Sequence, residues 1–466
     1  MIDLPTWKKA WALLDARERR KAWIVLVIVV FGALSSALMV GSVIPFLTVL
    51  SDPSRIESVA ALAWAYQTFD FTSDYTFLIG LGIASLAVIV LTSLVQILKT
   101  LAVARFSTMR VHSISHKLIA AYLRQPYEFF LNRHTGEMNT RILAESQQVV
   151  NQCLTPAANL VAGALTILTV IGLLLFVDPI VTLAAFSVLG GAYVGIYALN
   201  RRLLKGLGRK RVEANKMRFR IANEALGGIK DIKLLGREAS YVGRYAEPSK
   251  RMARTLVAVQ VISQVPQFIL QAVAYCGIIL LCVIMMDEEG LASGAGLGSI
   301  VPILGVFAFA GQRLMPELSK VYRSLAQLQA SAAAVDTIYE DLMDYAAGGA
   351  LPKTTPAGLG LRNHFELNEI SYRYPGADRA GVKDVSVKIG VGDRIGIVGG
   401  TGAGKTTLAD LILGLLAPEH GYIAVDGIPV TEKNLRAWQQ SVGYVPQEIF
   451  LTDACVSENI ALGVPK

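Results

Sequence analysis

The segment 399–406 reads Gly399-Gly400-Thr401-Gly402-Ala403-Gly404-Lys405-Thr406 and matches the pattern G-x-x-x-x-G-K-[ST] of a phosphate-binding loop. The short apolar run 394–398 before it predicts a buried β-strand, and the run 407–416 after it has the spacing of a helix. A strand, a glycine-rich loop and a helix in this order are the context in which the pattern marks a nucleotide site. A glycine-rich turn that carries a lysine by chance is the alternative, and the agreement of both flanks argues against it.

The residue types in this loop suit phosphate chemistry. Glycines leave backbone N–H groups free to surround a phosphate with no Cβ in the way, and the start of a helix adds partial positive charge. We expect Lys405 to reach the β- and γ-phosphates of ATP, and the hydroxyl of Thr406 to bind Mg²⁺. The residues expected to hold the nucleotide are Gly399, Gly400, Thr401, Gly402, Ala403, Gly404, Lys405, Thr406 and Thr407.

The composition of the chain is that of a membrane protein. Of its 466 residues, 53% are hydrophobic and only 17% are charged, whereas soluble domains carry about 25% charged residues. The net charge is +8, and the basic excess lies in short stretches that flank apolar runs. That distribution predicts the orientation of membrane spans rather than binding to nucleic acid, for which the sequence holds no recognition motif.

Six apolar runs are long enough to cross a bilayer. The connections expected outside hold a single Lys or Arg, whereas the others are strongly basic, so both ends of the chain are expected in the cytosol. Residues 1–21, with several basic side chains and two tryptophans, predict an amphipathic segment at the membrane surface. The predicted spans are 22–50, 75–98, 154–177, 180–199, 261–286 and 297–315.

Two polar, helix-rich excursions, residues 99–153 and 200–260, are expected to extend the spans into the cytosol. An aromatic segment at 125–137 interrupts the first and a glycine pair interrupts the second, which predicts helical hairpins with a short crosswise helix at each tip. Surface loops are the alternative, but apolar side chains so far from a membrane need a docking partner. The tip residues expected to couple the two parts of the protein are Tyr127, Phe129, Phe130, Gly227 and Gly228.

The composition changes after residue 345. The segment 346–362 is rich in Gly, Pro, Ala and Thr and indicates a linker. From 363 to 466, short strands and turns surround the phosphate-binding loop. We therefore predict the basic segment 1–21, a six-helix α-helical membrane domain at 22–345, the linker, and a partial α/β nucleotide-binding domain at 363–466.

This order of domains resembles a half-size ABC exporter. The stretch FELNEISYRYPG at 365–376 is similar to the family's strand that supplies an adenine-stacking aromatic, with Tyr374 as the match and Tyr372 as the alternative. The stretch 444–447, Tyr-Val-Pro-Gln, resembles the Q-loop, in which Gln447 would sense Mg²⁺ and the γ-phosphate and contact the membrane domain. The run 442–445 that leads to Gln447 is strand-like. The resemblance implies ATP and Mg²⁺ as cofactors and a second half-transporter subunit, with a homodimer expected.

The family pattern is incomplete over these residues. After the Q-loop the sequence holds no signature motif, no strand ending in Asp-Glu, and no switch histidine before it stops at Lys466. In the family, ATP lies between the phosphate-binding loop of one subunit and the signature motif of the other. The chain is therefore expected to be a fragment or a truncated product of an exporter subunit, able to bind nucleotide weakly but not to hydrolyse it.

A narrower likeness concerns the transported molecule. The segments 308–323, 228–238 and 445–463 look like those of lipid-linked oligosaccharide flippases of the PglK type. Arg313 lies in an otherwise apolar helix, where a cation costs about 3 kcal/mol, so it is expected to face a cavity or a partner. The alternatives are that Arg313 snorkels or pairs with Glu317, and that the other cations are ordinary positive-inside residues. The residues expected to bind an anionic headgroup are Arg313, Lys99, Arg105 and Arg254.

Three functions remain open at this point. The first is ATP-driven flipping of a lipid-linked oligosaccharide or similar anionic lipid across the bacterial inner membrane by alternating access, with the N-terminus and the nucleotide domain in the cytosol. The second is export of a peptide, a drug or another lipid. The third is a membrane-anchored nucleotide-binding protein that transports nothing.

Overall fold

The computed structural model describes residues 6–131, 133, 135–285, 295–345, 357–447 and 449–464. The chain forms two compact units, one made of residues 1–121 and 136–347, and the other of residues 122–135 and 348–466. The tip of the first excursion thus belongs to the second unit rather than to the helices that flank it. Most of the linker, at 346–356, lies outside the described residues.

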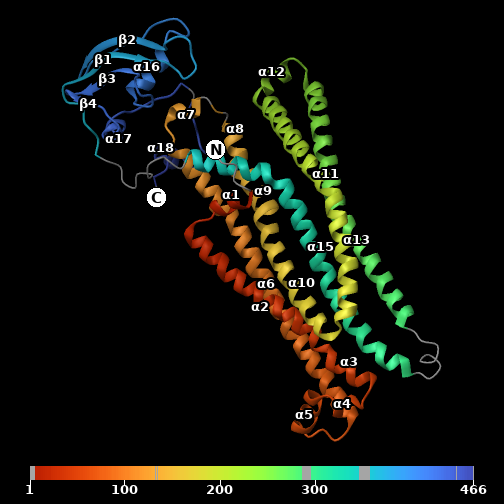
Figure 1. Ribbon diagram of the computed structural model, residues 1–466. Coiled ribbons are helices and arrows are strands. Elements are labelled where there is room, and N and C mark those ends of the chain that lie inside the picture. The colour runs from red at the N-terminus through yellow and green to blue at the C-terminus, as the bar shows by residue number, and fades with distance from the viewer. Residues whose placement is uncertain are drawn as a thin grey trace. The chain divides into compact units, whose positions relative to one another are not determined.

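The first unit is built from helices only in its described part (Figure 1). Its long helices contain the predicted spans, and most of them continue beyond the spans. The short helices α4 and α5 lie at one end of the unit. Two π-helical segments interrupt the helical run that leads into α10. The bounds are α1 Thr6–Ala12, α2 Ala16–Gly41, α3 Val43–Ser51, α4 Arg55–Ser58, α5 Ala60–Thr68, α6 Asp74–Leu123, α8 Thr135–Thr140, η1 Arg141–Glu145, α9 Ser146–Val149, η2 Val150–Leu154, α10 Thr155–Val177, α11 Pro179–Gly227, α12 Ile229–Leu234, α13 Glu238–Met285 and α15 Ala295–Asp344.

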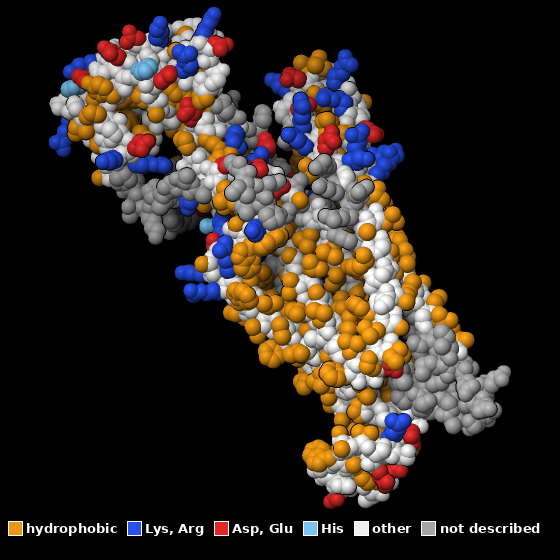
Figure 2. Space-filling model, in the orientation of Figure 1, with side chains coloured by type: hydrophobic (Ala, Val, Ile, Leu, Met, Phe, Trp, Pro, Cys, Tyr) orange, Lys and Arg blue, Asp and Glu red, His pale blue; other side chains and the backbone are white. Residues whose placement is uncertain are grey.

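Five described helical stretches are long and apolar enough to cross a membrane. The sixth predicted span, 297–315, forms the start of α15, where the side chains of the first residues lie outside what the structure describes. Figure 2 shows hydrophobic side chains along the outside of this unit, with Lys and Arg gathered around the tip formed by α11, α12 and α13. The five stretches are Ala16–Ser51, Asp74–Leu123, Gly136–Val177, Pro179–Ile196 and Glu238–Gly277.

Small residues let these helices approach closely. A Cβ on Gly305 of α15 would lie 2.5 Å from a methyl carbon of Leu47 on α3, and a Cβ on Gly163 of α10 would lie 2.8 Å from Val321. Close backbone approach replaces the hydrophobic effect as the source of packing between helices in lipid. The buried set around this contact is Val40, Val170, Leu174, Val306 and Ala310.

The second unit contains one antiparallel sheet with the strand order β2-β1-β3-β4. Its core joins the sheet to α16 and α17, where the rings of Phe365 and Trp438 stack with centroids 5.1 Å apart. The Trp438 indole N–H donates to the carbonyl of Ile412 at 2.8 Å. The bounds are α7 Tyr127–Leu131, β1 His364–Tyr372, β2 Val382–Gly390, α16 Lys405–Ile412, β3 His420–Val425, β4 Ile428–Pro429, α17 Leu435–Gln439 and α18 Val456–Ile460.

Two predictions in this unit are wrong. The run 394–398 is not a buried strand, because it pairs with no described strand and Val398 is 93% exposed. The run 442–445, also predicted as strand-like, is likewise unpaired, and Val445 is 88% exposed. An apolar pattern reports the side chains of a strand, whereas pairing depends on a neighbouring strand, and the described strands pair elsewhere.

Candidate functional site

The loop 399–404 takes a shape that requires glycine. Gly402 and Gly404 have φ of 81° and 86°, in the left-handed region. A Cβ on Gly404 would also lie 2.2 Å from the carbonyl oxygen of Gly381, which leaves no room for a side chain. Gly404 is the N-terminal cap of α16, so the loop delivers Lys405 to the first turn of that helix.

Lys405 closes over this loop. Its ammonium donates to the carbonyl oxygens of Gly399 at 2.9 Å and Gly400 at 2.7 Å. Thr406 is exposed, whereas Thr407 is buried at 6% exposure. Since one hydroxyl faces solvent beside a lysine and a glycine cradle, the residues present fit a nucleotide phosphate with Mg²⁺.

The described residues contain no group of three or more His, Cys, Asp or Glu side chains that could hold a metal ion. Magnesium commonly keeps waters and binds through a few protein oxygens together with phosphates. The hydroxyl of Thr406 would therefore hold Mg²⁺ jointly with a bound nucleotide, which supplies the charged oxygens.

Tyr374 lies beside the start of α16. Its hydroxyl is 3.1 Å from the hydroxyl of Thr407, and its ring packs close to Gly381, where an added Cβ would lie 3.3 Å from the ring. Tyr372, the alternative adenine-stacking residue, is buried in the core at 3% exposure. Because a core residue presents no free ring face, the geometry favours Tyr374 for this role, which stays a prediction.

Gln447 follows the extended run 442–445 and is exposed. In the part of the chain that the structure describes, no hydrogen bond joins Gln447 to the loop 399–404 or to Thr406. Its role in sensing Mg²⁺ and the γ-phosphate therefore stays a prediction.

The first tip contacts the sheet of the same unit through a residue that the sequence reasoning missed. The hydroxyl of Tyr372 donates to a carboxylate oxygen of Glu128, on α7, at 2.5 Å. Phe129 stacks on Tyr122 with centroids 6.3 Å apart and meets Phe130 edge-on at 5.2 Å, while Tyr127 is 39% exposed. A carboxylate among three aromatic residues, Tyr127, Phe129 and Phe130, was the available sequence signal for this contact.

The second tip is helical, as predicted. α11 ends at Gly227, and Gly228 connects it to the short helix α12. Leu234 is 82% exposed and Leu235 is 68% exposed at this tip. The expectation that these residues dock on a nucleotide domain stays a prediction.

In the membrane domain, Arg313 does not pair with Glu317. Its guanidinium donates to the hydroxyl of Ser36 on α2, with Nη2 at 2.9 Å and Nε at 3.3 Å. No ion pair joins Arg313 to Glu317 in the described part of the chain. The same serine accepts from the amide of Gln96, whose Nε2 also donates to Gly32 and Ser35. Gln96, Ser35 and Ser36 were missed at the sequence level, although polar residues in apolar helices were the signal.

Two buried charges lie close to Arg313. Lys99 is 3% exposed and its chain covers Gly32, where a Cβ would clash with Lys99 Cδ at 2.5 Å. Glu317 is 7% exposed, and its nearest cation is Lys320 at 4.0 Å. Lys99 Nζ and Glu317 Oε2 have no hydrogen-bond partner within the described residues. The charge of Lys99 interacts with those of Glu317, Arg313 and Lys320, and we call these four residues the membrane charge cluster.

Arg105 and Arg254 stand apart from this cluster. Both are exposed, on α6 and α13, and no hydrogen bond or ion pair links either to the membrane charge cluster in the described structure. Of the four cations expected to bind a headgroup, the structure brings together Lys99 and Arg313.

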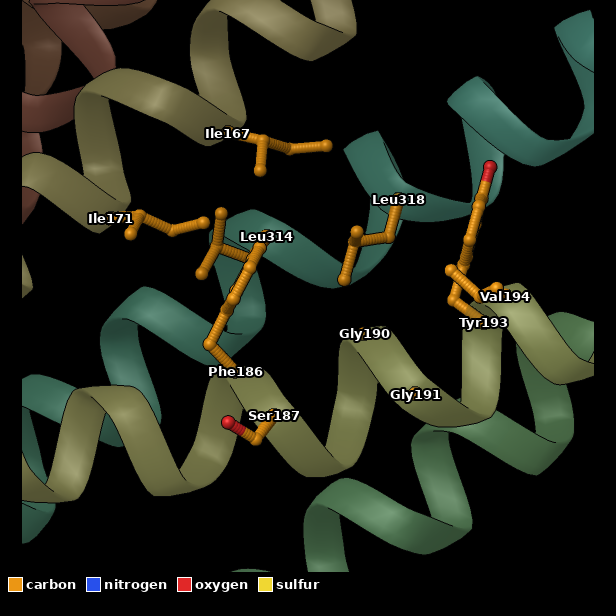
Figure 3. A pocket seen from close by; sticks show the side chains of 10 residues that line it. All are labelled: Ile167, Ile171, Phe186, Ser187, Gly190, Gly191, Tyr193, Val194, Leu314 and Leu318. Atoms are coloured by element: carbon orange, nitrogen blue, oxygen red, sulfur yellow. The ribbon is translucent and has the colours of Figure 1, made fainter.

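An apolar cavity of about 430 Å³ lies between α10, α11 and α15. Figure 3 shows Ile167 and Ile171 of α10 beside Leu314 and Leu318 of α15, with α11 along the other side. Leu314 and Leu318 flank Glu317 along α15. On α10, the packing position Gly163, where a Cβ would lie 3.4 Å from Glu317 Oε2, is one turn before Ile167. The cavity and the membrane charge cluster therefore share α15, and α10 lines the cavity while it packs against Glu317 at Gly163.

Comparisons with known proteins bear on both units. A family model described as the ABC transporter transmembrane region matches residues 22–288, and one described as ABC transporter matches residues 382–463. The structure of a bacterial Atm1-family ABC exporter with ATP bound matches with a TM-score of 0.65 and 18% identity, over 96% of this chain and 74% of that one. This match shows a shared fold.

Curated relatives match at low identity. An ATP-dependent lipid A-core flippase of Thiobacillus denitrificans is 24% identical over 395 residues, which is 84% of this chain and 66% of that protein. A protein of the same name from Psychrobacter arcticus is 27% identical over 361 residues, or 76% of this chain and 58% of that protein. The chain thus spans about three fifths of the length of these relatives.

Proposed function

Because the chain belongs to the ABC transporter family, we propose that it is part of an exporter subunit that uses ATP to flip an anionic lipid across a bacterial membrane. The carrying observation is the membrane charge cluster, in which Lys99 Nζ and Glu317 Oε2 are buried and have no hydrogen-bond partner within the described residues. A cation inside apolar helices costs about 3 kcal/mol and is typical of a transport pathway.

The chemistry of the cluster favours a phosphate-bearing headgroup. A guanidinium presents a planar fork of donors that suits phosphate, and Lys99 adds a second cation. The apolar cavity on α10 and α15 suits a hydrocarbon chain of the same molecule. Relatives named lipid A-core flippases support a lipid rather than a peptide or a drug. Within this class, the resemblance of 308–323 favours a lipid-linked oligosaccharide.

The nucleotide unit supplies the energy in this proposal. Lys405 and Thr406 hold the phosphates and Mg²⁺, Tyr374 stacks on the adenine, and Gln447 responds to the γ-phosphate. A second subunit, proposed to be identical, completes the site. Alternating access then exposes the membrane charge cluster to one side of the inner membrane and then the other, with the nucleotide unit in the cytosol.

The test compares Arg313 with Arg254, an exposed arginine that lies outside the cluster. The variants are made in the complete exporter subunit, purified, and assayed in proteoliposomes for ATP-dependent flipping of a fluorescent anionic glycolipid. A lost hydrogen bond between charged groups costs about 1.5–3 kcal/mol, so Arg313→Ala should slow flipping by roughly tenfold or more. Arg313→Lys should retain part of the rate, and Arg254→Ala should behave as wild type. The basal rate of ATP hydrolysis of each variant should stay within about twofold of the wild-type rate.

A structural role for Arg313 predicts a different pattern. If its bond to Ser36 only holds α2 against α15, Ser36→Ala should lower folded yield as much as Arg313→Ala does, with flipping per folded molecule unchanged. That result would remove the headgroup role. Absence of ATP-dependent flipping in the wild-type protein would instead favour a nucleotide-binding membrane protein that transports nothing.

A further inference from the structure

A continuous line of contacts runs from the phosphate-binding helix to the first tip. Thr407 on α16 lies 3.1 Å from the hydroxyl of Tyr374. The rings of Tyr374 and Tyr372 meet edge-on with centroids 5.1 Å apart. The hydroxyl of Tyr372 donates to Glu128 on α7 at 2.5 Å. All four residues belong to the second unit.

The sequence explains why the two tyrosines act together. Tyr372 is the last residue of β1 and Tyr374 follows two positions later, and residues two apart along an extended chain face the same side. A buried phenol needs a hydrogen-bond partner for its hydroxyl. Glu128 supplies that partner to Tyr372, which is 3% exposed, so the tip is tied to the strand by a directional bond.

Burial and the neighbouring carboxylate keep the Tyr372 hydroxyl protonated in this hydrogen bond. Burial, followed by the hydrogen bond to the Glu128 carboxylate, raises the pKa of Tyr372 above its ordinary value. The phenol therefore stays protonated and remains the donor at neutral pH. Asp410, one helical turn after Thr407 on α16, is 9% exposed, and its charge acts on both Tyr372 and Tyr127 of the tip.

We propose that Tyr372 and Glu128 are a positioning pair that links occupancy of the nucleotide site to the first tip, independently of Gln447. The proposal rests on the proposed use of ATP. An adenine stacked on Tyr374, with phosphates at the start of α16, changes the contact between Tyr374 and Thr407. Tyr372 contacts the ring of Tyr374 edge-on and donates a hydrogen bond to Glu128. A shift of the Tyr374 ring therefore changes how α7 packs against β1.

Thermodynamic reciprocity makes the proposal testable without transport. If the nucleotide biases the position of the tip, breaking the tip contact must change nucleotide affinity by the same factor. Tyr372→Phe removes only the hydroxyl and keeps the buried ring, and Glu128→Ala removes the acceptor. ATP affinity of the purified chain is measured for both variants and their double variant. Tyr422→Phe and Glu432→Gln, at exposed positions of the same unit, are the matched controls.

Each single change should shift ATP affinity by about fivefold, the low end of typical coupling between sites. The double variant should shift it no further, because both changes break one contact. In the complete exporter carrying the same changes, the number of lipids flipped per ATP hydrolysed should fall in parallel. The controls should match wild type.

Two results would overturn the proposal that Tyr372 and Glu128 are coupled to the nucleotide site. In the first result, Tyr372→Phe and Glu128→Ala bind ATP as wild type does, while the second unit unfolds at a lower temperature. The contact would then be purely structural. In the other, the two shifts add in the double variant. If the wild-type protein flips no lipid, the proposed function fails, but the affinity cycle still decides whether Tyr372 and Glu128 are coupled to the nucleotide site.

Discussion

At the residue scale, Lys405 shows how one side chain prepares the nucleotide site. Its ammonium bonds to two carbonyl oxygens of its own loop, at Gly399 and Gly400. These are neutral acceptors, whereas a phosphate oxygen carries negative charge and attracts the ammonium by Coulomb interaction as well. The lysine is therefore held close to the position where it would meet a phosphate, and an incoming phosphate readily replaces its present partners.

Replacement of Lys405 by Ala should weaken ATP binding to the purified chain by at least about tenfold, since a charge-assisted bond is lost. Hydrolysis by the complete exporter should fall to background. Equilibrium binding and phosphate release measure the two effects. Lys433→Ala, at an exposed lysine beyond β4, is the control and should change neither. Near-wild-type turnover by Lys405→Ala would refute the site.

The residue scale also shows where sequence reasoning stops. The placement of Lys405 and Thr406 at the start of the helix after the glycine loop follows from a motif with fixed spacing, so it could be predicted, while their roles stay predictions. The partner of Arg313 could not, because spacing on one helix suggests Glu317, whereas the guanidinium reaches Ser36 on another helix. The contact of Glu128 with Tyr372 joins residues 244 positions apart, which no local pattern reports.

At the element scale, the helices were the predictable part. The first five predicted spans coincide with described apolar helices, because apolar length reports a membrane helix directly. The helix after the phosphate-binding loop is present as α16, although it ends at Ile412 rather than at 416. The runs 394–398 and 442–445 failed as strands because a strand needs a partner, and apolar composition does not name one.

The element proposed to link nucleotide binding to transport is the short helix α7. It contributes the half-buried rings of Phe129 and Phe130 and the carboxylate of Glu128 to the second unit, while its flanking helices belong to the first. A five-residue helix has little stability of its own. Its position therefore depends on these side-chain contacts, which suits an element that transmits movement.

Replacement of both Phe129 and Phe130 by Ser should separate hydrolysis from transport. The tip loses the apolar contact of two half-buried rings, each worth less than the about 1.5–3 kcal/mol of a fully buried ring, and is expected no longer to follow the nucleotide unit. Proteoliposomes that hold the complete exporter with these changes should still hydrolyse ATP but flip far fewer lipids per ATP. The double change to Leu keeps an apolar tip and should retain most coupling. An unaltered ratio in the Ser variant would show that α7 does not couple the units.

At the scale of the whole molecule, charge and hydropathy follow the long axis of the helical unit. The tip of α11, α12 and α13 gathers Lys and Arg, whereas the connection 51–74 carries a single basic residue, Arg55 (Figure 2). Basic residues remain on the cytosolic side of short connections. The sequence alone predicts this orientation because insertion depends on local charge and apolar length, which are properties of the chain rather than of its packing.

That orientation predicts which positions an impermeant thiol reagent reaches in intact cells. Asp70, exposed between α5 and α6, should be labelled as Asp70→Cys, while Ser240→Cys, exposed near the start of α13, should be protected. The native Cys455 is exposed in the nucleotide unit and serves as an internal control that should react only after permeabilisation. A second outer position, Asp287, lies outside the described residues. Labelling of Ser240→Cys in cells that protect Asp70→Cys would invert the topology, and with it the side on which the proposed lipid would first meet the membrane charge cluster.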